Sequence, residues 1–414
     1  MEVFTVGGAV RDLMMGRTPA DYDYVVVGST PEQMLSLDYR LVGADFPVFL
    51  HPETGAEYAL ARTERKAGPA AKGFVVHSSP DVTLEQDLGR RDLTINAMAI
   101  EVGADKVVDP YGGQRDIRNK VLRHVSADSF AEDPVRVLRL GRFAARYTDF
   151  TVAPETLALC QEMVAAGALD NLVAERVWQE LAKGLMETQP SRMFEVLRAC
   201  GALRVVLPEV DALWGVPQTA THHPEVDTAV HTLMVVDQAA AAGGSIEVRF
   251  AALVHDLGKA LTPAAGWPAH HGHEELGVKP VKALCARLRV PSNCREVAVL
   301  VCAQHLLVHK AFDLRSASVV KLLARADAFR RPERLEALLA ACEADARGRL
   351  GFENRPYPQA GYLRSVLAAT AAVDTGAVAK TCAQPVQIPL AIHAARVRAA
   401  KSVARTIQSP GACA

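Results

Sequence analysis

The sequence lacks the features of membrane proteins and of disulfide-bonded secreted proteins. No stretch reaches the roughly 18 uncharged apolar residues of a membrane span, and residues 1–8 carry no basic segment followed by an apolar core. The eight cysteines include no CxxC pair, and several fall inside apolar helical patterns, so we expect buried, reduced thiols. These absences predict a cytoplasmic protein with no membrane partner.

An excess of charge of either sign is missing as well. Lys and Arg total 46 against 47 for Asp and Glu, which gives a net charge of -1. Any binding site for a polyanion must therefore be a local patch. Half of the 414 residues are apolar and only 6% are aromatic, which is typical of a helix-rich globular protein with about two to four domains.

The residue pattern divides the chain into an α/β part and a helical part. Short β-rich runs between Gly, Pro and Asp residues occur at 3–6, 22–27, 48–50, 58–62, 95–101 and 106–109. From Asp133 onward the apolar period becomes about 3.6, and we expect Pro134 to begin a helix. A loop-like segment, 216–224, separates two helical blocks.

The first candidate site is a glycine pair followed by paired carboxylates. Gly7 and Gly8 lie between an expected strand and an expected helix, where backbone N–H groups can face a phosphate; a tight turn without a ligand is the alternative. Asp21 and Asp23 head the next strand, whose period of two projects both carboxylates to one side. Such a pair favours a divalent metal clamp for phosphoryl or nucleotidyl transfer, although two solvated aspartates at a strand end are also compatible.

Five segments in order resemble the motif series of bacterial class II tRNA nucleotidyltransferases, the CCA-adding enzymes. They are 7–12 (GGAVRD), 21–23 (DYD), 90–97 (RRDLTINA), 109–113 (DPYGG) and 132–139 (EDPVRVLR). The resemblance covers at least residues 1–210. It implies an α+β nucleotidyltransferase head of the polymerase-β type, followed by a mostly all-α neck and body, an HD domain and a helical tail. We expect these four domains at 1–125, 126–222, 223–350 and 351–414.

The resemblance also implies roles for individual residues. Asp21 and Asp23 would be catalytic and hold Mg²⁺. The residues expected to bind the nucleotide, CTP or ATP, are Gly8, Arg11, Arg91, Asp92, Asp133, Arg136 and Arg139. A ribose hydroxyl donates well to a carboxylate such as Asp92. A surface salt-bridge cluster is the alternative for residues 90–92.

Asp133 and Arg136 allow two interpretations. An Asp before Pro134 is typical of a helix N-cap. Three-residue spacing also lets Asp133 accept and Arg136 donate toward one planar partner, which matches the amino donor and ring-nitrogen acceptor of cytosine and adenine but not uracil or guanine. Arg136, Arg139, Arg142 and Arg146 form a stripe of about 120° on this helix, interpreted either as a solvated face or as a site for triphosphate or tRNA.

The second candidate site is rich in histidine. His255 and Asp256 end an apolar helix, with His231 upstream and His270, His271 and His273 downstream, a pattern that favours metal binding over an isolated packed histidine. It resembles the HD phosphohydrolase domain, which implies His231, His255 and Asp256 as ligands. For the last ligand we expect Asp345 rather than Asp313 or Asp327, because it follows a long amphipathic helix, and His273 and His305 are further candidates. Mixed N and O ligands do not distinguish Mg, Mn, Co, Ni and Zn.

These resemblances imply a multifunctional enzyme. It would add CCA to the tRNA 3′ end from CTP and ATP with release of pyrophosphate. Its HD domain would act as a phosphatase, 2′-nucleotidase and 2′,3′-cyclic phosphodiesterase with a divalent metal, Ni²⁺ being one candidate. The alternatives are a poly(A) polymerase of the same family, which usually carries a GRRF segment where this chain has 42–52, and a tRNA-binding HD phosphohydrolase. Whether the chain forms a homo-oligomer is open.

Overall fold

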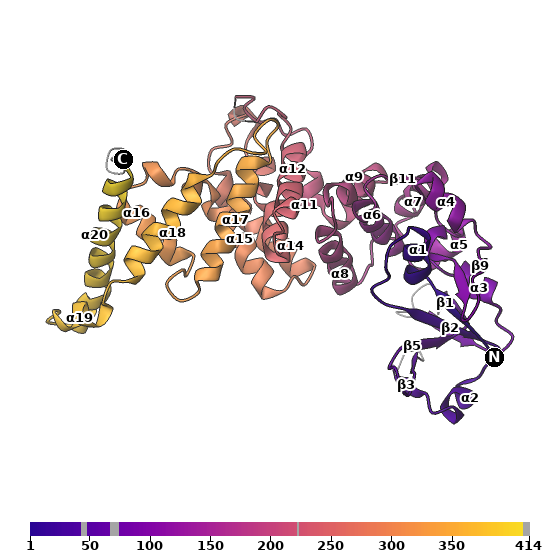
Figure 1. Ribbon diagram of the computed structural model, residues 1–414. Coiled ribbons are helices and arrows are strands. Elements are labelled where there is room, and N and C mark those ends of the chain that lie inside the picture. Colours follow the sequence, from indigo (N-terminus) through magenta and orange to yellow (C-terminus); the bar gives the residue numbers. More distant parts are fainter. Residues whose placement is uncertain (43–47, 67–73, 222, 409–414) are drawn as a thin grey trace. The chain divides into compact units, whose positions relative to one another are not determined.

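The computed structural model describes residues 1–42, 48–66, 74–221 and 223–408 (Figure 1). The chain forms two compact units, each described by itself. The first comprises Met1–Leu172 and Glu195–Val205, and the second comprises Val173–Phe194 and Val206–Ala414. The predicted fold class, an α+β part followed by a mostly helical part, is confirmed. The four domain boundaries expected from the sequence stay a prediction.

The first unit is built on a seven-stranded mixed sheet with the order β3-β4-β5-β2-β1-β8-β9. Its strands are β1 (Glu2–Val6), β2 (Asp23–Val27), β3 (Arg40–Val42), β4 (Val48–Leu50), β5 (Glu57–Leu60), β8 (Ala99–Glu101) and β9 (Val107–Val108). Two small pairs join β6 (Arg62–Lys66) to β7 (Phe74–Ser78) and β10 (Val121–Leu122) to β11 (Thr151–Val152). Its helices are α1 (Gly8–Met14), α2 (Pro31–Ser36), α3 (Leu84–Gly89), α4 (Gly113–Asn119), α5 (Ala127–Glu132), α6 (Arg136–Arg146), α7 (Pro154–Ala165) and most of α10 (Ala202–Val206).

Strand β2 is covered on both faces, which explains its continuous apolar run. Successive strand side chains point to opposite faces, yet Val25 and Val26 are only 2% and 1% exposed. Val25 packs in a core with Phe4 of β1, and Val26 packs in a second core with Met34 of α2 and Phe49 of β4. The sheet is therefore a rigid support for the residues at the start of β2.

Two sequence predictions in this unit need correction. The strand expected over 95–101 is shorter, because Thr94–Asn96 form a 3₁₀ turn in which the N–H of Thr94 donates to the carbonyl of Arg123 at 2.9 Å. The helix expected to begin at Pro134 begins at Arg136 instead. Asp133 is the residue that closes α5, so Asp133 and Pro134 lie in the turn between two helices.

The second unit is a set of packed helices. They are α8 (Ala174–Leu185), α11 (Pro208–Asp211), α12 (Thr228–Ala241), α13 (Ile246–Val254), α14 (His273–Arg287), α15 (Ser292–His309), α16 (Ser316–Arg325), α17 (Pro332–Arg347), α18 (Pro358–Ala371), α19 (Thr375–Lys380) and α20 (Ile388–Gln408); α9 (Ser191–Ala199) spans the division between the units. α13 packs against α12, α15 and α17. Among the described helices, none combines the length and apolarity that a membrane crossing requires.

Gly258, in the 3₁₀ helix Leu257–Leu261 after α13, allows a close approach to α14. A Cβ atom at this position would overlap the backbone carbonyl of His273 and would lie 2.7 Å from the backbone nitrogen of Gly277. A side chain of any size is therefore excluded here. At Gly266, a few residues further on, a Cβ atom would meet no other atom of the described residues within 4 Å, so this position offers a matched control.

We expect Gly258→Ala to destabilise the second unit by about 3 kcal/mol, at the upper end of the range for overpacking, because backbone atoms on both sides would have to move apart. Urea unfolding followed by circular dichroism measures this change. Gly266→Ala should leave the unfolding midpoint unchanged. Equal midpoints for the two variants would contradict the steric argument.

Two candidate active sites

The glycine turn of the first unit brings together the end of β1, the start of α1 and Arg91. Gly7 has a φ of +67°, which residues with a side chain rarely adopt, and a Cβ atom there would lie 2.7 Å from Nη1 of Arg91. Gly8 is the first residue of α1, and a Cβ atom there would lie 3.5 Å from Nη2 of Arg11. The structure therefore places Gly8, Arg11 and Arg91 in one region.

Exposed carboxylates lie at the end of the sheet next to this turn. Antiparallel pairing sets Asp23 opposite Val6, the residue before the two glycines, and Asp21 precedes Asp23 by two positions. Parallel pairing of β2 with β5 sets Glu57 directly opposite Asp23, and residues in register project to the same face of a sheet. All three carboxylates are exposed. Sequence reasoning missed Glu57, because only the strand register makes it a neighbour of Asp23.

Asp92 is 5% exposed, and its carboxylate is fully occupied. Oδ1 accepts hydrogen bonds from the N–H of Leu93 at 2.8 Å and from Nδ2 of Asn96 at 2.9 Å. Oδ2 accepts from Nε of Arg139 at 2.8 Å and lies 2.7 Å from its Nη2. Burial alone would raise the pKa of Asp92, but the charge of Arg139 and these donors hold the pKa at about 2. With about four lone-pair sites already used, Asp92 would have to release a donor before it accepts a ribose hydroxyl.

Arg11 is a buried arginine, at 5% exposed. Its Nη1 donates to Oδ1 of Asn96 at 2.7 Å, and its Nε donates to Oδ1 of Asp12 at 3.0 Å. Its guanidinium carbon lies 5.7 and 5.6 Å from the ring centres of Phe143 and Tyr147. Through Asn96, Arg11 is coupled to the Asp92 carboxylate, so three of the sequence motifs form one network.

Asp133 and Arg136 lie at the same turn, before and at the start of α6. Nη1 of Arg136 donates to the carbonyl oxygens of Ser129 at 2.7 Å and Arg91 at 3.2 Å. Oδ1 of Asp133 accepts from the N–H of Val135 at 3.4 Å, which is a weak contact. Arg136 therefore also links α6 to the backbone of Ser129 and Arg91, whereas the hydrogen bond from Val135 to the Asp133 side chain is weak.

The arginine stripe on α6 is not a solvated face. Arg136 and Arg142 are each 8% exposed. The guanidinium carbons of Arg142 and Arg139 lie 4.7 and 5.9 Å from the ring centre of Phe143. The solvated-face interpretation is therefore wrong for Arg136 and Arg142, which are buried, and for Arg139, which pairs with Asp92. The fourth arginine of the stripe, Arg146, is half-buried.

In the second unit, residues far apart in the sequence meet in one buried cluster. Its members are His231 on α12, His255 at the end of α13, Asp256 directly after it, His273 at the start of α14, His305 on α15 and Asp345 on α17, with exposed fractions of 0%, 1%, 1%, 5%, 2% and 4%. The four ligands expected from the sequence are thus brought together. The two further candidates, His273 and His305, lie in the same cluster.

All four imidazole rings are oriented by backbone carbonyls. The Nδ1 atoms of His231, His255, His273 and His305 lie 2.9, 2.8, 2.8 and 3.1 Å from the carbonyl oxygens of Gly348, Ala252, His270 and Val301. A carbonyl oxygen can only accept a hydrogen bond, so the proton of each neutral ring belongs on Nδ1. Each Nε2 then presents a lone pair to the inside of the cluster.

On one side of Asp256, these lone pairs face carboxylate oxygens. Nε2 of His231 lies 3.1 Å from Oδ1 of Asp345, and Nε2 of His255 lies 3.1 Å from Oδ2 of Asp256. Two acceptors at such a distance repel each other unless a cation lies between them. Nε2 of His255 and Oδ1 of Asp256 are also buried without a hydrogen-bond partner among the described residues. These observations fit a divalent metal ion.

A second group of acceptors lies on the other side of Asp256. Oδ1 of Asp256 is 3.2 Å from Nε2 of His273, which is itself 3.2 Å from Nε2 of His305. Burial lowers the pKa of His305 to about 3, so this ring stays neutral and does not donate from Nε2. His255, His231 and Asp345 on one side, and His273 and His305 with Asp256 on the other, form two separate ligand sets.

The two carboxylates have further partners outside the cluster. Nζ of Lys259 lies 2.6 Å from Oδ2 of Asp256. Oδ2 of Asp345 lies 2.6 Å from Nε2 of His309, whose Nδ1 lies 2.9 Å from the hydroxyl of Tyr357. These contacts fix the orientation of both carboxylates, as outer partners of metal ligands commonly do.

The remaining candidates from the sequence lie elsewhere. Asp327 forms ion pairs with Arg330 and Arg331, at 2.7 and 3.0 Å, and Asp313 is exposed. Both ring nitrogens of His270 are already used, by Thr262 and by the carbonyl of Pro217, each at 2.7 Å. His271 is exposed.

Three family models match this chain. Residues 3–123 match the Poly A polymerase head domain, residues 149–213 match the family described as the probable RNA and SrmB-binding site of polymerase A, and residues 228–340 match the HD domain. The first match contains the glycine turn and its carboxylates. The third contains every ligand of the buried cluster except Asp345.

Solved structures share the fold. A CCA-adding enzyme in complex with CTP superposes with a TM-score of 0.63 at 21% identity and covers 98% of this chain and 90% of that chain. The Bacillus stearothermophilus CCA-adding enzyme, also in complex with CTP, gives a TM-score of 0.63 at 23% identity, with 98% of this chain and 89% of that chain covered.

Curated relatives are far closer in sequence. The multifunctional CCA protein of Dechloromonas aromatica is 59% identical over 99% of this chain and 98% of the relative. That of Chromobacterium violaceum is 61% identical over 96% of this chain and 97% of the relative. With the motif network and the HD cluster in place, the chain belongs to the family of multifunctional CCA proteins.

Proposed function

We propose that the protein adds CCA to the 3′ end of tRNA from CTP and ATP, releasing pyrophosphate, and that its HD domain hydrolyses phosphate esters. One observation carries the proposal: the glycine turn, the exposed carboxylates and the arginine network come together in a chain that is 59% identical to a multifunctional CCA protein over almost its whole length. The cytoplasmic location expected from the sequence stays a prediction, and the oligomeric state stays open.

In the first unit, Asp21 and Asp23, with Glu57 beside them, would hold Mg²⁺. Carboxylate oxygens are the ligands that Mg²⁺ prefers, and these three are exposed and so accessible to a triphosphate. The bound metal would lower the pKa of the attacking hydroxyl and stabilise charge on the phosphates. Gly8 allows the backbone to approach the triphosphate, and Arg91 and Arg139 supply fixed positive charge. The terminal tRNA hydroxyl attacks the α-phosphorus as its bond to pyrophosphate breaks.

In the second unit, we propose two divalent metal sites that share Asp256. His231, His255 and Asp345 would complete the first site, and His273 and His305 the second. Metal at such sites supplies a Lewis acid and activates water for attack on phosphorus. Four imidazole ligands favour Ni²⁺, Co²⁺ or Zn²⁺ over Mg²⁺, so nickel remains a candidate. The ester class would include the 2′-nucleotides and 2′,3′-cyclic phosphates expected from the sequence.

A poly(A) polymerase is the second candidate function, because the head matches a family named for that enzyme. Incubating tRNA that lacks its 3′ end with each labelled NTP separates the functions. Incorporation of CTP and ATP that stops after three nucleotides supports CCA addition, whereas long adenylate tails support the polymerase. No incorporation would favour a tRNA-binding hydrolase.

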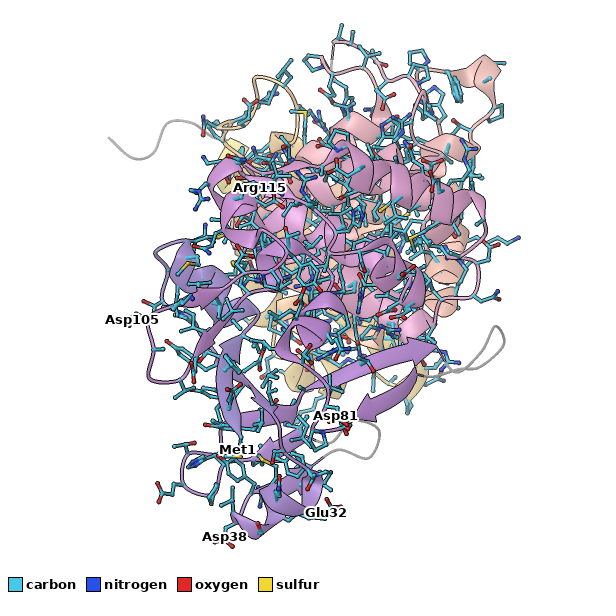
Figure 2. All side chains as sticks on the ribbon, turned by 90° about the vertical axis from the view of Figure 1, so that its right-hand side faces the viewer. Met1, Glu32, Asp38, Asp81, Asp105 and Arg115 are labelled. Carbon is cyan, nitrogen blue, oxygen red and sulfur yellow. The ribbon has the colours of Figure 1, made fainter. Side chains whose placement is uncertain are left out.

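We expect Asp23→Asn to reduce CMP addition to below about one percent of wild type, because losing a catalytic metal ligand raises the barrier by several kcal/mol. Phosphatase activity of the HD domain should be unchanged. Asp105→Asn, at an exposed position between β8 and β9 (Figure 2), removes the same charge from a different loop and should leave both activities intact. Substantial CMP addition by Asp23→Asn would exclude Asp23 as a ligand.

We expect Asp133→Asn to erode the preference for CTP and ATP over UTP and GTP, because the amide reverses part of the acceptor pattern offered to the base. Stability should change by less than about 1 kcal/mol, since the hydrogen bond from the N–H of Val135 to this side chain is weak at 3.4 Å. Single-NTP kinetics and the melting temperature of the same variant give both quantities. An unchanged nucleotide preference with a lowered melting temperature would leave Asp133 a structural residue.

We expect the wild-type protein to bind two Ni²⁺ ions per chain at its histidine cluster and His305→Leu to bind one, because leucine keeps the buried volume but offers no ligand atom. Ni²⁺ is chosen because imidazole binds it well, unlike the carboxylates of the first unit. Calorimetric titration gives the stoichiometry. His271→Ala, an exposed neighbour, is the control. One Ni²⁺ in both proteins would argue for a single shared metal.

A further inference from the structure

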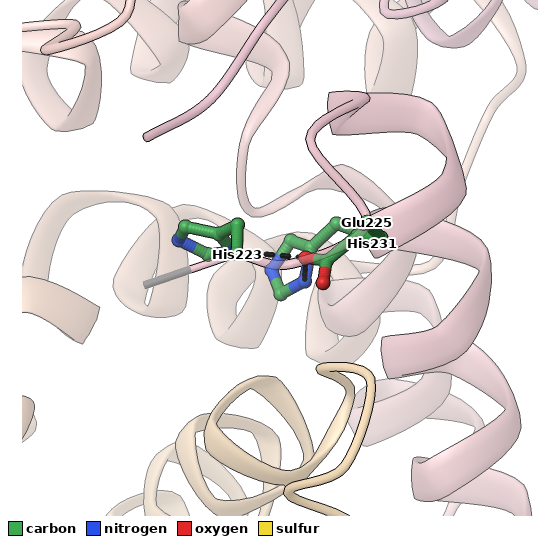
Figure 3. A group of neighbouring side chains, drawn as sticks. All are labelled: His223, Glu225 and His231. Atoms are coloured by element: carbon green, nitrogen blue, oxygen red, sulfur yellow. Dashed lines mark hydrogen bonds and ion pairs between the residues drawn. The ribbon is translucent and has the colours of Figure 1, made fainter. Parts of the chain in front are cut away.

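Glu225, which sequence reasoning did not single out, has a nearly buried carboxylate beside the HD cluster (Figure 3). Its side chain is 3% exposed, and its Oε1 lies 3.0 Å from Nδ1 of His223 and 3.1 Å from Nδ1 of His231. Its Oε2 accepts a hydrogen bond from the N–H of Leu350 at 3.4 Å. One carboxylate therefore contacts a proposed metal ligand, a histidine before α12 and the segment after α17.

This carboxylate makes His231 different from the other three histidines of the cluster. Within the described residues, the Nδ1 atoms of His255, His273 and His305 face backbone carbonyls of their own or the preceding turn. A carboxylate oxygen of Glu274 also lies near Nδ1 of His273, but its distance of 3.8 Å is too long for a hydrogen bond. Nδ1 of His231 instead faces the carbonyl of Gly348, distant in sequence, and the charged Oε1 of Glu225. A carboxylate behind a metal-binding imidazole fixes the ring and makes its free nitrogen a stronger ligand.

Glu225 also connects the segments that carry the first and the last expected ligand. It precedes α12, which carries His231, and it binds Leu350, which follows the α17 helix of Asp345. Gly348 lies tightly against α12, since a Cβ atom there would lie 2.5 Å from Cγ2 of Val235. The Glu225 contact to Leu350, which is weak at 3.4 Å, thus adds to close backbone packing between the two segments.

Two alternative interpretations are weaker. His223, Glu225 and His231 could be a third metal site, but Nδ1 of His231 lies 2.9 Å from the carbonyl of Gly348, which requires a proton on that nitrogen. Glu225 could also be neutral. Its two carboxyl oxygens, however, face three groups that can donate, Nδ1 of His223, Nδ1 of His231 and the N–H of Leu350, so the ionised form, which only accepts, fits these contacts better.

We propose that Glu225 is a positioning residue of the HD metal site, which holds His231 toward the metal and increases its affinity without contacting metal or substrate. This inference rests on the proposed metal-binding function of the cluster. Outer-shell carboxylates of this kind typically contribute a factor of about 10 to 100 in metal affinity.

The test is calorimetric titration of the full-length, tag-free protein with Ni²⁺, together with metal-free melting curves. We expect Glu225→Gln to raise the Kd of at least one Ni²⁺ by about 10- to 100-fold. Glu353→Gln removes the same charge from the segment next to Leu350 without touching a ligand, and should keep the wild-type Kd. Glu225→Asp keeps the charge but shortens the side chain, so it should lose the contact with His231 and weaken Ni²⁺ binding as well.

The outcomes separate this inference from the function on which it rests. No Ni²⁺ binding by the wild type would overturn both. Wild-type binding with an unchanged Kd in Glu225→Gln would overturn the positioning role alone, as would a variant without a cooperative melting transition, because the role would then be structural. A Kd for Glu225→Asp equal to that of the wild type would show that the negative charge matters and the contact with His231 does not. This result would also overturn the positioning role.

Discussion

Both units of this protein contain buried carboxylates whose negative charge must be compensated. Removing a carboxylate from water costs several kcal/mol, so each buried one needs donors or positive charge around it. In the first unit, Asp87 and Asp92 receive them from arginines, which are always charged. In the second unit, Asp256 has Lys259 on one oxygen, but otherwise faces imidazole Nε2 atoms. Those rings do not donate from Nε2 while neutral, so either a metal ion or an added proton has to lie between them and the carboxylate.

In the first unit, the buried carboxylate differs from the exposed carboxylates in its capacity to bind a further partner. Asp92 is held by four donors and ties Arg139 of α6 to Asn96, so its chemical capacity is already used. Asp21 and Asp23 are exposed at the end of a sheet that is buried on both faces. Their open position at the end of interior strands fits the metal-binding role that we propose for them. The charged motif that contains Asp92 therefore supports the site, and the carboxylates proposed to bind metal, Asp21 and Asp23, belong to a neighbouring motif.

The sequence predicted the fold class and the convergence of its motifs, but not the contacts that orient them. Ordered motifs and the His255–Asp256 pair are local patterns, and they led to both candidate sites. Glu57 becomes a candidate only because the register of β2 and β5 places it opposite Asp23. Glu225 becomes one only because the segment after α17, which contains Leu350, lies against it. The helix start at Pro134 was wrong because Asp133 closes α5 instead of capping α6. Local sequence signals cannot distinguish such caps when two helices meet in a short turn.

The histidine cluster also explains how the second unit can fold before metal binds. Its ligands come from α12, α13, α14, α15 and α17, so a bound ion would join helices that are far apart in the sequence. Burial opposes charge on His255, yet the neighbouring Asp256 raises its pKa, so a proton can occupy the space between them in the absence of metal. The backbone carbonyls that orient the four Nδ1 atoms are independent of any ion. A metal ion at the proposed site would therefore replace a proton in a cluster whose ring orientations the backbone sets, and it would add to the stability of the unit by mass action.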